Sequence, residues 1–162
     1  MSEPQMPEDD AETAAAIDWL ARDEGVWDAE MEVTPFPGAP VSRTSGTSTN
    51  RMVAGRWLVT DIVTDSGYAG HGIYGWDPGA RQFVAAWVDV MGGSIARGTG
   101  TLDDAGEIMT YEVAVQYEGR TARYREVTER RPDGTRLYRN LQPTPEGAEH
   151  ETVRAVYSPR PG

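Results

Sequence analysis

Hydrophobic and polar residues alternate with a period of two along most of this chain, the pattern of strands with one buried face. The stretch 81–91, RQFVAAWVDVM, is the clearest case. It places Phe83, Trp87 and Asp89 on one face. Turn signals separate such stretches, as at Asp77-Pro78-Gly79, where proline and glycine favour a tight turn. The pattern therefore predicts a chain made mostly of short strands.

About ten strands are predicted in all. They cover residues 25–34, 45–53, 56–64, 69–77, 81–91, 94–102, 107–117, 121–130, 135–141 and 151–157. Tight turns join them and no helix lies between them, which is typical of an antiparallel meander. Closing such a meander removes its exposed edges, so we predict an all-β, antiparallel up-and-down barrel that encloses a ligand cavity.

The N-terminal segment differs from the rest. Residues 12–22, ETAAAIDWLAR, have the alanine content and apolar spacing of a short helix. Residues 1–11 combine proline, charge and few apolar groups, so we expect a disordered acidic tail. A chain of 162 residues is long enough for one core, and 12–162 is predicted as a single domain.

Composition narrows the classes of function. The net charge is −11, but residues 1–32 carry −10 of it, so the nearly neutral body is a poor nucleic-acid binder. No apolar run is long enough to span a membrane. The absence of cysteine fits a cytoplasmic protein, and the absence of lysine excludes a lysine Schiff base. Two histidines without paired spacing predict no metal site, and we expect no cofactor.

His71 and Asp89 fall on neighbouring predicted strands. An aspartate that orients a histidine makes a general base which titrates near neutral pH. The alternative is a structural hydrogen bond in the barrel wall. Gly70 and Gly72 flank the histidine and indicate close approach of a side chain or a ligand.

Arginines and aromatic residues are the other candidate ligand contacts. Arg125 and Arg139 share faces with apolar residues, and together with Arg51 they could bind a carboxylate or phenolate inside the barrel. Alternatively, the arginines lie outside in ion pairs with glutamates. The candidate lining residues are Trp57, Tyr74, Trp87, Met91, Tyr111 and Tyr138. Core packing is the alternative for each of these aromatic residues.

Several motifs resemble a bacterial family known only as domain of unknown function 1579. They are Gly25-x-Trp27, the run Ser42 to Val59, Gly70-His71-Gly72, Gly75-Trp76-Asp77 and Trp87 to Met91. The resemblance covers about residues 15–158. It implies a calycin-like barrel, similar to lipocalins, and no known activity. The signature positions that it carries over are Asn50, Arg51, Gly55, His71, Gly75, Trp87, Asp89 and Met91.

These observations predict a protein that binds a small, largely apolar organic molecule with a polar or acidic handle. One alternative is a cofactor-free cyclase or isomerase in which His71 and Asp89 transfer protons. A second alternative is a haem-binding barrel of the nitrobindin kind, with His150 as axial ligand. A third is a packed barrel that acts through its outer face in an oligomer, and a homodimer is left open.

Overall fold

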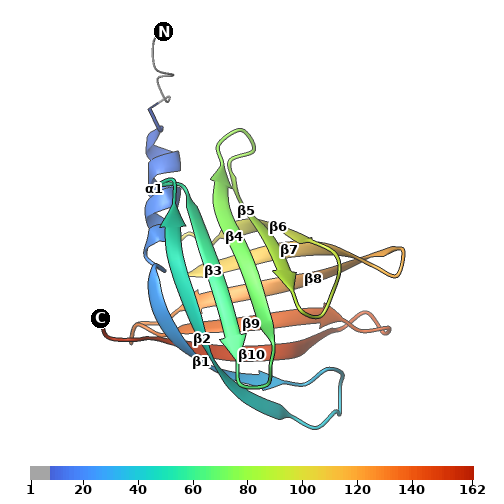
Figure 1. Cartoon of the computed structure of the whole chain (residues 1–162). Coiled ribbons are helices and arrows are strands. Elements are labelled where there is room, and N and C mark those ends of the chain that lie inside the picture. The colour runs from blue at the N-terminus through green and yellow to red at the C-terminus, as the bar shows by residue number, and fades with distance from the viewer. Residues whose placement is uncertain (1–7) are drawn as a thin grey trace.

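The structure, a computed structural model that describes residues 8–162, is a closed barrel of ten antiparallel strands with one helix at its end (Figure 1). The helix is α1 (Ala11–Ala21). The strands are β1 (Gly25–Val33), β2 (Ser42–Val53), β3 (Trp57–Thr64), β4 (Ala69–Asp77), β5 (Gln82–Asp89), β6 (Ala96–Leu102), β7 (Ile108–Tyr117), β8 (Arg120–Arg130), β9 (Arg136–Pro143) and β10 (Glu149–Pro159). Every strand pairs with its neighbours in the chain, so the topology is up-and-down.

The first and last strands close the barrel. β1 pairs with β2 on one side and with β10 on the other, and Ala29 lies opposite both Gly46 and Tyr157. The register of β10 against β9 shifts between Glu151 and Val153, which marks a bulge. Closure pairs the edges of all ten strands, so the barrel presents no free edge within residues 8–162.

Alternate residues of each strand face the interior, and the register carries this alternation around the barrel. On β8 the inward positions include Tyr124, Glu126 and Arg130. Glu126 lies opposite Tyr111 of β7 and Asn140 of β9, which therefore face inward as well. The interior wall of β7 to β9 thus mixes aromatic rings with polar groups.

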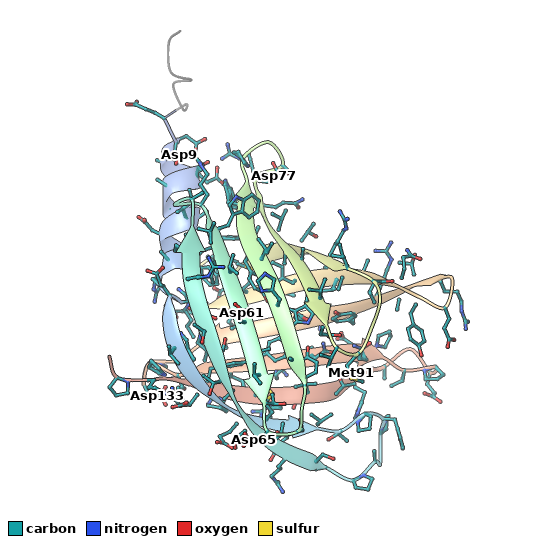
Figure 2. All side chains as sticks on the ribbon, in the orientation of Figure 1. Asp9, Asp61, Asp65, Asp77, Met91 and Asp133 are labelled. Atoms are coloured by element: carbon teal, nitrogen blue, oxygen red, sulfur yellow. The ribbon has the colours of Figure 1, made fainter. Side chains whose placement is uncertain are left out.

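The two ends of the barrel are built differently, and we call them the helix end and the far end. The helix end contains the connections 22–24, 54–56, 78–81, 103–107 and 131–135. The far end contains the connections 34–41, 65–68, 90–95, 118–119 and 144–148. In Figure 2, Asp77 and Asp133 mark the helix end, and Asp65 and Met91 mark the far end.

Helix α1 begins at a side-chain cap and packs against β3 and β4. The Asp10 carboxylate accepts a hydrogen bond from the Thr13 amide at 2.7 Å, which is a favourable N-cap. Leu20 is buried in the main hydrophobic cluster, and the Trp19 ring meets Phe83 edge-on at 5.5 Å. The helix therefore covers one end of the barrel interior.

The predicted fold is confirmed as an antiparallel barrel of ten strands with an N-terminal helix. Strand limits agree with the predicted limits within three residues, and the helix begins one residue earlier than predicted. Of the predicted tail, residues 1–7 lie outside the described residues, and the single-domain division stays a prediction. Within residues 8–162, no helix is both long and apolar enough to cross a membrane.

Candidate functional site

A buried ion-pair triad occupies the helix end. Asp23, in the connection between α1 and β1, lies 2.9 Å from an Nη of Arg130 and 2.7 Å from an Nη of Arg136. All three side chains are about nine-tenths buried. A buried carboxylate needs such partners, because desolvation of an unpaired charge is costly. The triad therefore ties the end of the helix to β8 and β9.

Two indoles complete this end. The Arg130 guanidinium lies 3.8 Å from the Trp19 ring centroid, and that of Arg136 lies 3.9 Å from the Trp27 ring centroid. These stacked positions explain why Nη1 of Arg130 and Nε of Arg136 have no hydrogen-bond acceptor. The Trp27 indole donates to the Asp23 carbonyl at 2.9 Å, and the Asn50 amide donates to the same oxygen. Arg130 and Arg136 are therefore both bound to Asp23 and stacked on indole rings, so the helix end is a structural centre.

A second polar centre lies deeper in the interior, on β8. Glu126 faces inward opposite Asn140, and Tyr138 is the adjacent inward residue of β9. Burial raises the pKa of the Glu126 carboxyl to about 7, and the nearby Tyr138 hydroxyl offsets only part of that rise. No cation among residues 8–162 contributes to this pKa. Glu126 is therefore a carboxyl group that changes charge near neutral pH.

Six tyrosines share the barrel interior with Glu126. For each of them, burial raises the phenol pKa, and the nearby Glu126 charge raises it further. They are Tyr68, Tyr74, Tyr111, Tyr124, Tyr138 and Tyr157. The rings of Tyr74 and Tyr111 meet edge-on at 5.8 Å. We call Glu126 and these six residues the tyrosine wall.

Much of the tyrosine wall keeps solvent-accessible surface although it faces the interior. Tyr74, Tyr124, Glu126, Tyr138 and Tyr157 are each half-buried rather than buried. In a small barrel with a filled core, inward side chains interdigitate and lose nearly all of their surface. Solvent therefore reaches part of the inward-facing surface beside Glu126.

Asp89 lies at the far end of the interior and is fully hydrogen-bonded. Its Oδ2 accepts from the Tyr68 hydroxyl at 3.0 Å and from the Trp87 indole at 3.1 Å. Its Oδ1 accepts from the Met91 amide at 2.9 Å. Three donors satisfy most of the capacity of one carboxylate. In contrast to Glu126, Asp89 has little capacity left for a ligand.

The expected contact between His71 and Asp89 is not formed. β4 pairs with β5 so that His71 lies opposite Val88 and Asp89 lies opposite Gly70, which puts the two side chains on opposite faces. His71 Nδ1 instead lies 2.7 Å from the carboxylate of Asp61, which is visible on the outer wall in Figure 2. Both side chains are about half exposed. Any acid–base role of His71 would therefore use Asp61, outside the barrel.

The glycines beside His71 accommodate a side chain. A Cβ atom at Gly70 would come within 2.2 Å of Cζ2 of Trp87, and one at Gly72 within 2.6 Å of Cε3. The Trp87 ring therefore lies flat against the backbone of β4. The sequence left open whether a side chain or a ligand approaches these glycines. In the structure, the side chain of Trp87 does so.

The three candidate arginines lie outside the barrel, which corrects the expectation that they point inward. Arg51 is exposed on the outer face of β2. Arg125 donates to Glu149 at 2.7 Å, and Arg139 lies 3.6 Å from Glu151. β8 and β9 are each offset by one residue from the face that was expected to point inward. The alternative of exterior ion pairs with glutamates therefore describes Arg125 and Arg139, although the partner glutamates differ.

The candidate aromatic residues divide into two groups. Tyr74, Trp87, Tyr111 and Tyr138 face the interior, as expected of lining or core residues. Trp57 lies on the outer face, 40% exposed, with its ring against Gly75. Met91 is 79% exposed in the connection between β5 and β6. Their roles in binding stay predictions.

His150, considered as a haem ligand, lies at the far end of β10. Its Nε2 lies 2.6 Å from the Thr34 carbonyl, which accepts the hydrogen bond. Nε2, the ring nitrogen best placed to reach a haem iron, is thus hydrogen-bonded to the backbone of the connection after β1. His150 in this arrangement anchors that connection.

The sequence-based predictions missed the charged residues of these centres, which are Asp23, Glu126, Arg130 and Arg136, and three tyrosines of the tyrosine wall, which are Tyr68, Tyr124 and Tyr157. The alternation of β8 contains a signal for three of them, because Tyr124, Glu126, Thr128 and Arg130 share one face. The competing face contains Val127 and was preferred for that reason. Asp23 lies in a connection, where no periodicity applies.

Comparisons with known proteins agree with this architecture. The crystal structure of Rv2717c from M. tuberculosis matches with a TM-score of 0.66 and 13% sequence identity, covering 90% of this chain and 98% of that chain. At this identity the likeness extends to the fold alone. A search of curated proteins gave no match. The model of the DUF1579 family matches residues 12–159, which confirms the resemblance seen in the sequence. The chain therefore belongs to DUF1579, a family of proteins of unknown function.

Proposed function

We propose that the barrel binds a small, largely apolar organic molecule in its interior, with a polar group of the ligand at Glu126 and Tyr138. The observation that carries this proposal is the accessible surface of the inward-facing tyrosine wall. A ligand with an aromatic or aliphatic body would cover this surface, and its polar group would use the unfilled hydrogen-bonding capacity of Glu126.

The positions of the arginines change the polar group that we expect on the ligand. Because Arg51, Arg125 and Arg139 lie outside, and Arg130 and Arg136 are held by Asp23, the tyrosine wall offers an acidic ligand no cation. We therefore propose a ligand whose polar group is not acidic.

Titration with N-phenyl-1-naphthylamine, an uncharged dye whose emission rises in apolar surroundings, tests the proposal. We expect saturable binding with one site per chain. Ala122→Trp places a large ring on the inner face of β8, at its far end, and we expect it to weaken dye binding about tenfold or more. Arg123→Trp adds the same ring one residue along, on the outer face, and should leave binding unchanged.

Two results would contradict this proposal. One is the absence of saturable dye binding to the folded protein. The other is equal weakening by the two tryptophan variants, which would place the dye on the outer wall. An absorption spectrum of the protein purified from its own host adds a check, because a Soret band would favour the haem alternative.

A second candidate function is supported by the titration of Glu126. A carboxyl group with a pKa of about 7 next to phenol donors has the properties of a general acid or base for proton transfer without a cofactor. This role assigns to Glu126 the acid–base chemistry that His71 and Asp89 were expected to perform. Loss of turnover in Glu126→Gln, with ligand binding retained, would distinguish an isomerase or cyclase from a carrier.

A further inference from the structure

The interior of the barrel holds a carboxylate whose charge no neighbouring cation balances. Arg130 and Arg136 face inward, but both are bound to Asp23 at the helix end. The other arginines of β8 and β9 near Glu126, Arg125 and Arg139, pair with glutamates on the outside. Within residues 8–162, Glu126 forms no ion pair, and the polar group that acts on its pKa is the neutral Tyr138 hydroxyl. A ligand that brings a positive charge would supply the missing partner.

Aromatic rings share the interior with this carboxylate. Tyr111 lies opposite it on β7 and meets Tyr74 of β4 edge-on at 5.8 Å, and Tyr138 is an adjacent inward residue of β9. The faces of such rings carry partial negative charge and attract cations. A carboxylate within an aromatic wall combines the two features that proteins use to hold an organic ammonium group.

We propose that the interior ligand is an organic amine bound as its ammonium ion, with the ammonium group on Glu126 and an apolar body along the tyrosine wall. This inference rests on the proposed binding function and names the ligand class for it. An ammonium group would donate hydrogen bonds to the Glu126 carboxylate. A ligand carboxylate would instead add a second negative charge to the same space.

The binding of an amine should depend on pH in a defined direction. Because burial raises the pKa of Glu126 to about 7, part of the empty protein carries a proton there at neutral pH. Amine binding requires the ionised carboxylate, so affinity should rise between pH 5.5 and 8. The six facing tyrosines do not titrate in this range, because their pKa values are raised. Binding of an uncharged ligand has no such requirement.

Calorimetry with three ligands of one shape tests the inference. They are 2-naphthylmethylamine, 2-naphthylmethanol and 2-naphthoic acid. We expect the amine to bind about tenfold more tightly than the alcohol, and the acid to bind most weakly. Glu126→Gln should bring the amine to the level of the alcohol. Glu129→Gln, on the exposed outer face of the same strand, should change nothing.

The outcomes separate the inference from the proposed function. If the alcohol binds and the amine gains nothing, or if Glu126→Gln leaves the amine affinity unchanged, the amine inference is wrong while the binding function stands. If none of the three ligands binds, both fail. The pH series on the unsubstituted protein adds a readout that does not depend on any variant: amine affinity that stays flat from pH 5.5 to 8 also contradicts the inference.

Discussion

The two ends of the barrel differ in the kinds of side chain that they bury and expose. At the helix end, charged and aromatic groups are buried together: Asp23, Arg130 and Arg136 form the triad, and Trp19 and Trp27 cover its cations. At the far end, the connections 34–41 and 90–95 contain no charged residue at all. Their exposed apolar side chains are Phe36, Val41, Val90, Met91 and Ile95.

We relate this difference to stability of the barrel at the helix end and to ligand access at the far end. Buried ion pairs and indole hydrogen bonds fix the helix end in one arrangement, at the cost of desolvating three charges. At the far end, connections 34–41 and 90–95 are uncharged, whereas 65–68, 118–119 and 144–148 each contain one acidic residue. Glu126 and its tyrosines keep accessible surface deeper in the interior. A barrel that binds ligands needs one end that holds the wall in place and another through which a ligand can pass.

The largest effect is expected at the triad. Asp23→Asn leaves two buried guanidinium groups without their carboxylate and should lower the free energy of unfolding by about 3–5 kcal/mol. Urea denaturation would measure this change. Glu32→Gln, which breaks an exposed pair with Arg43, is the matched control and should change stability little. Similar losses in the two variants would show that the buried triad contributes no more than a surface pair.

Glu126 should make stability depend on pH. Its folded-state pKa of about 7 exceeds the value of 4.5 of an ordinary glutamate, so the folded protein holds the proton more tightly than the unfolded chain does. This contribution is complete below about pH 4.5 and is lost as the pH rises to about 7, by up to about 3 kcal/mol. Urea denaturation of Glu126→Gln across this range should show a flatter profile, whereas Glu129→Gln should keep the slope of the unsubstituted protein.

The contact between Trp87 and β4 should be sensitive to a single methyl group. Gly70→Ala puts a Cβ atom 2.2 Å from the Trp87 ring, so the ring or the strand must move. We expect a loss of about 1–3 kcal/mol and a shift of the tryptophan emission. Gly92→Ala adds the same methyl group where no atom lies within 4 Å, and it should leave both readouts unchanged.

The smallest effect on stability is expected at the rim of the far end. Phe36→Ser removes an exposed ring that is 62% accessible, so the free energy of unfolding should change by less than about 0.5 kcal/mol. Thermal unfolding followed by circular dichroism would measure it. A clear loss of stability would mean that the rim packs against the barrel and that the two ends are less different than we describe.

The fold was largely predictable because β-strand alternation and turn chemistry are local. Asp77-Pro78-Gly79 indicates a turn from its own residues, and the structure has one there, with the Asp77 carboxylate accepting from the Gly79 amide at 2.9 Å. The alternation of Phe83, Trp87 and Asp89 likewise fixes one face of β5 without reference to any other strand.

The candidate site was less predictable, because both faces of β8 and β9 mix charged and apolar residues. Leu137 and Leu141 suggested an inner face for β9, yet both lie outside and are buried beneath neighbouring side chains, whereas Tyr138 and Asn140 face inward. A one-residue slip inverts a strand, so these arginines were assigned to the wrong side. His71 and Asp89 were separated by the register of β4 against β5, which the sequence of either strand alone does not contain.

The pairing of β1 with β10 has a consequence for how the protein is made. β1 leaves the ribosome more than a hundred residues before its second partner, β10. Until β10 emerges, the nascent chain can form only an open sheet with two unpaired edges, which are hazards for aggregation. Closure is thus expected only after β10 has left the ribosome, and stalled ribosomes whose chains lack β10 should carry chains that proteases cut readily.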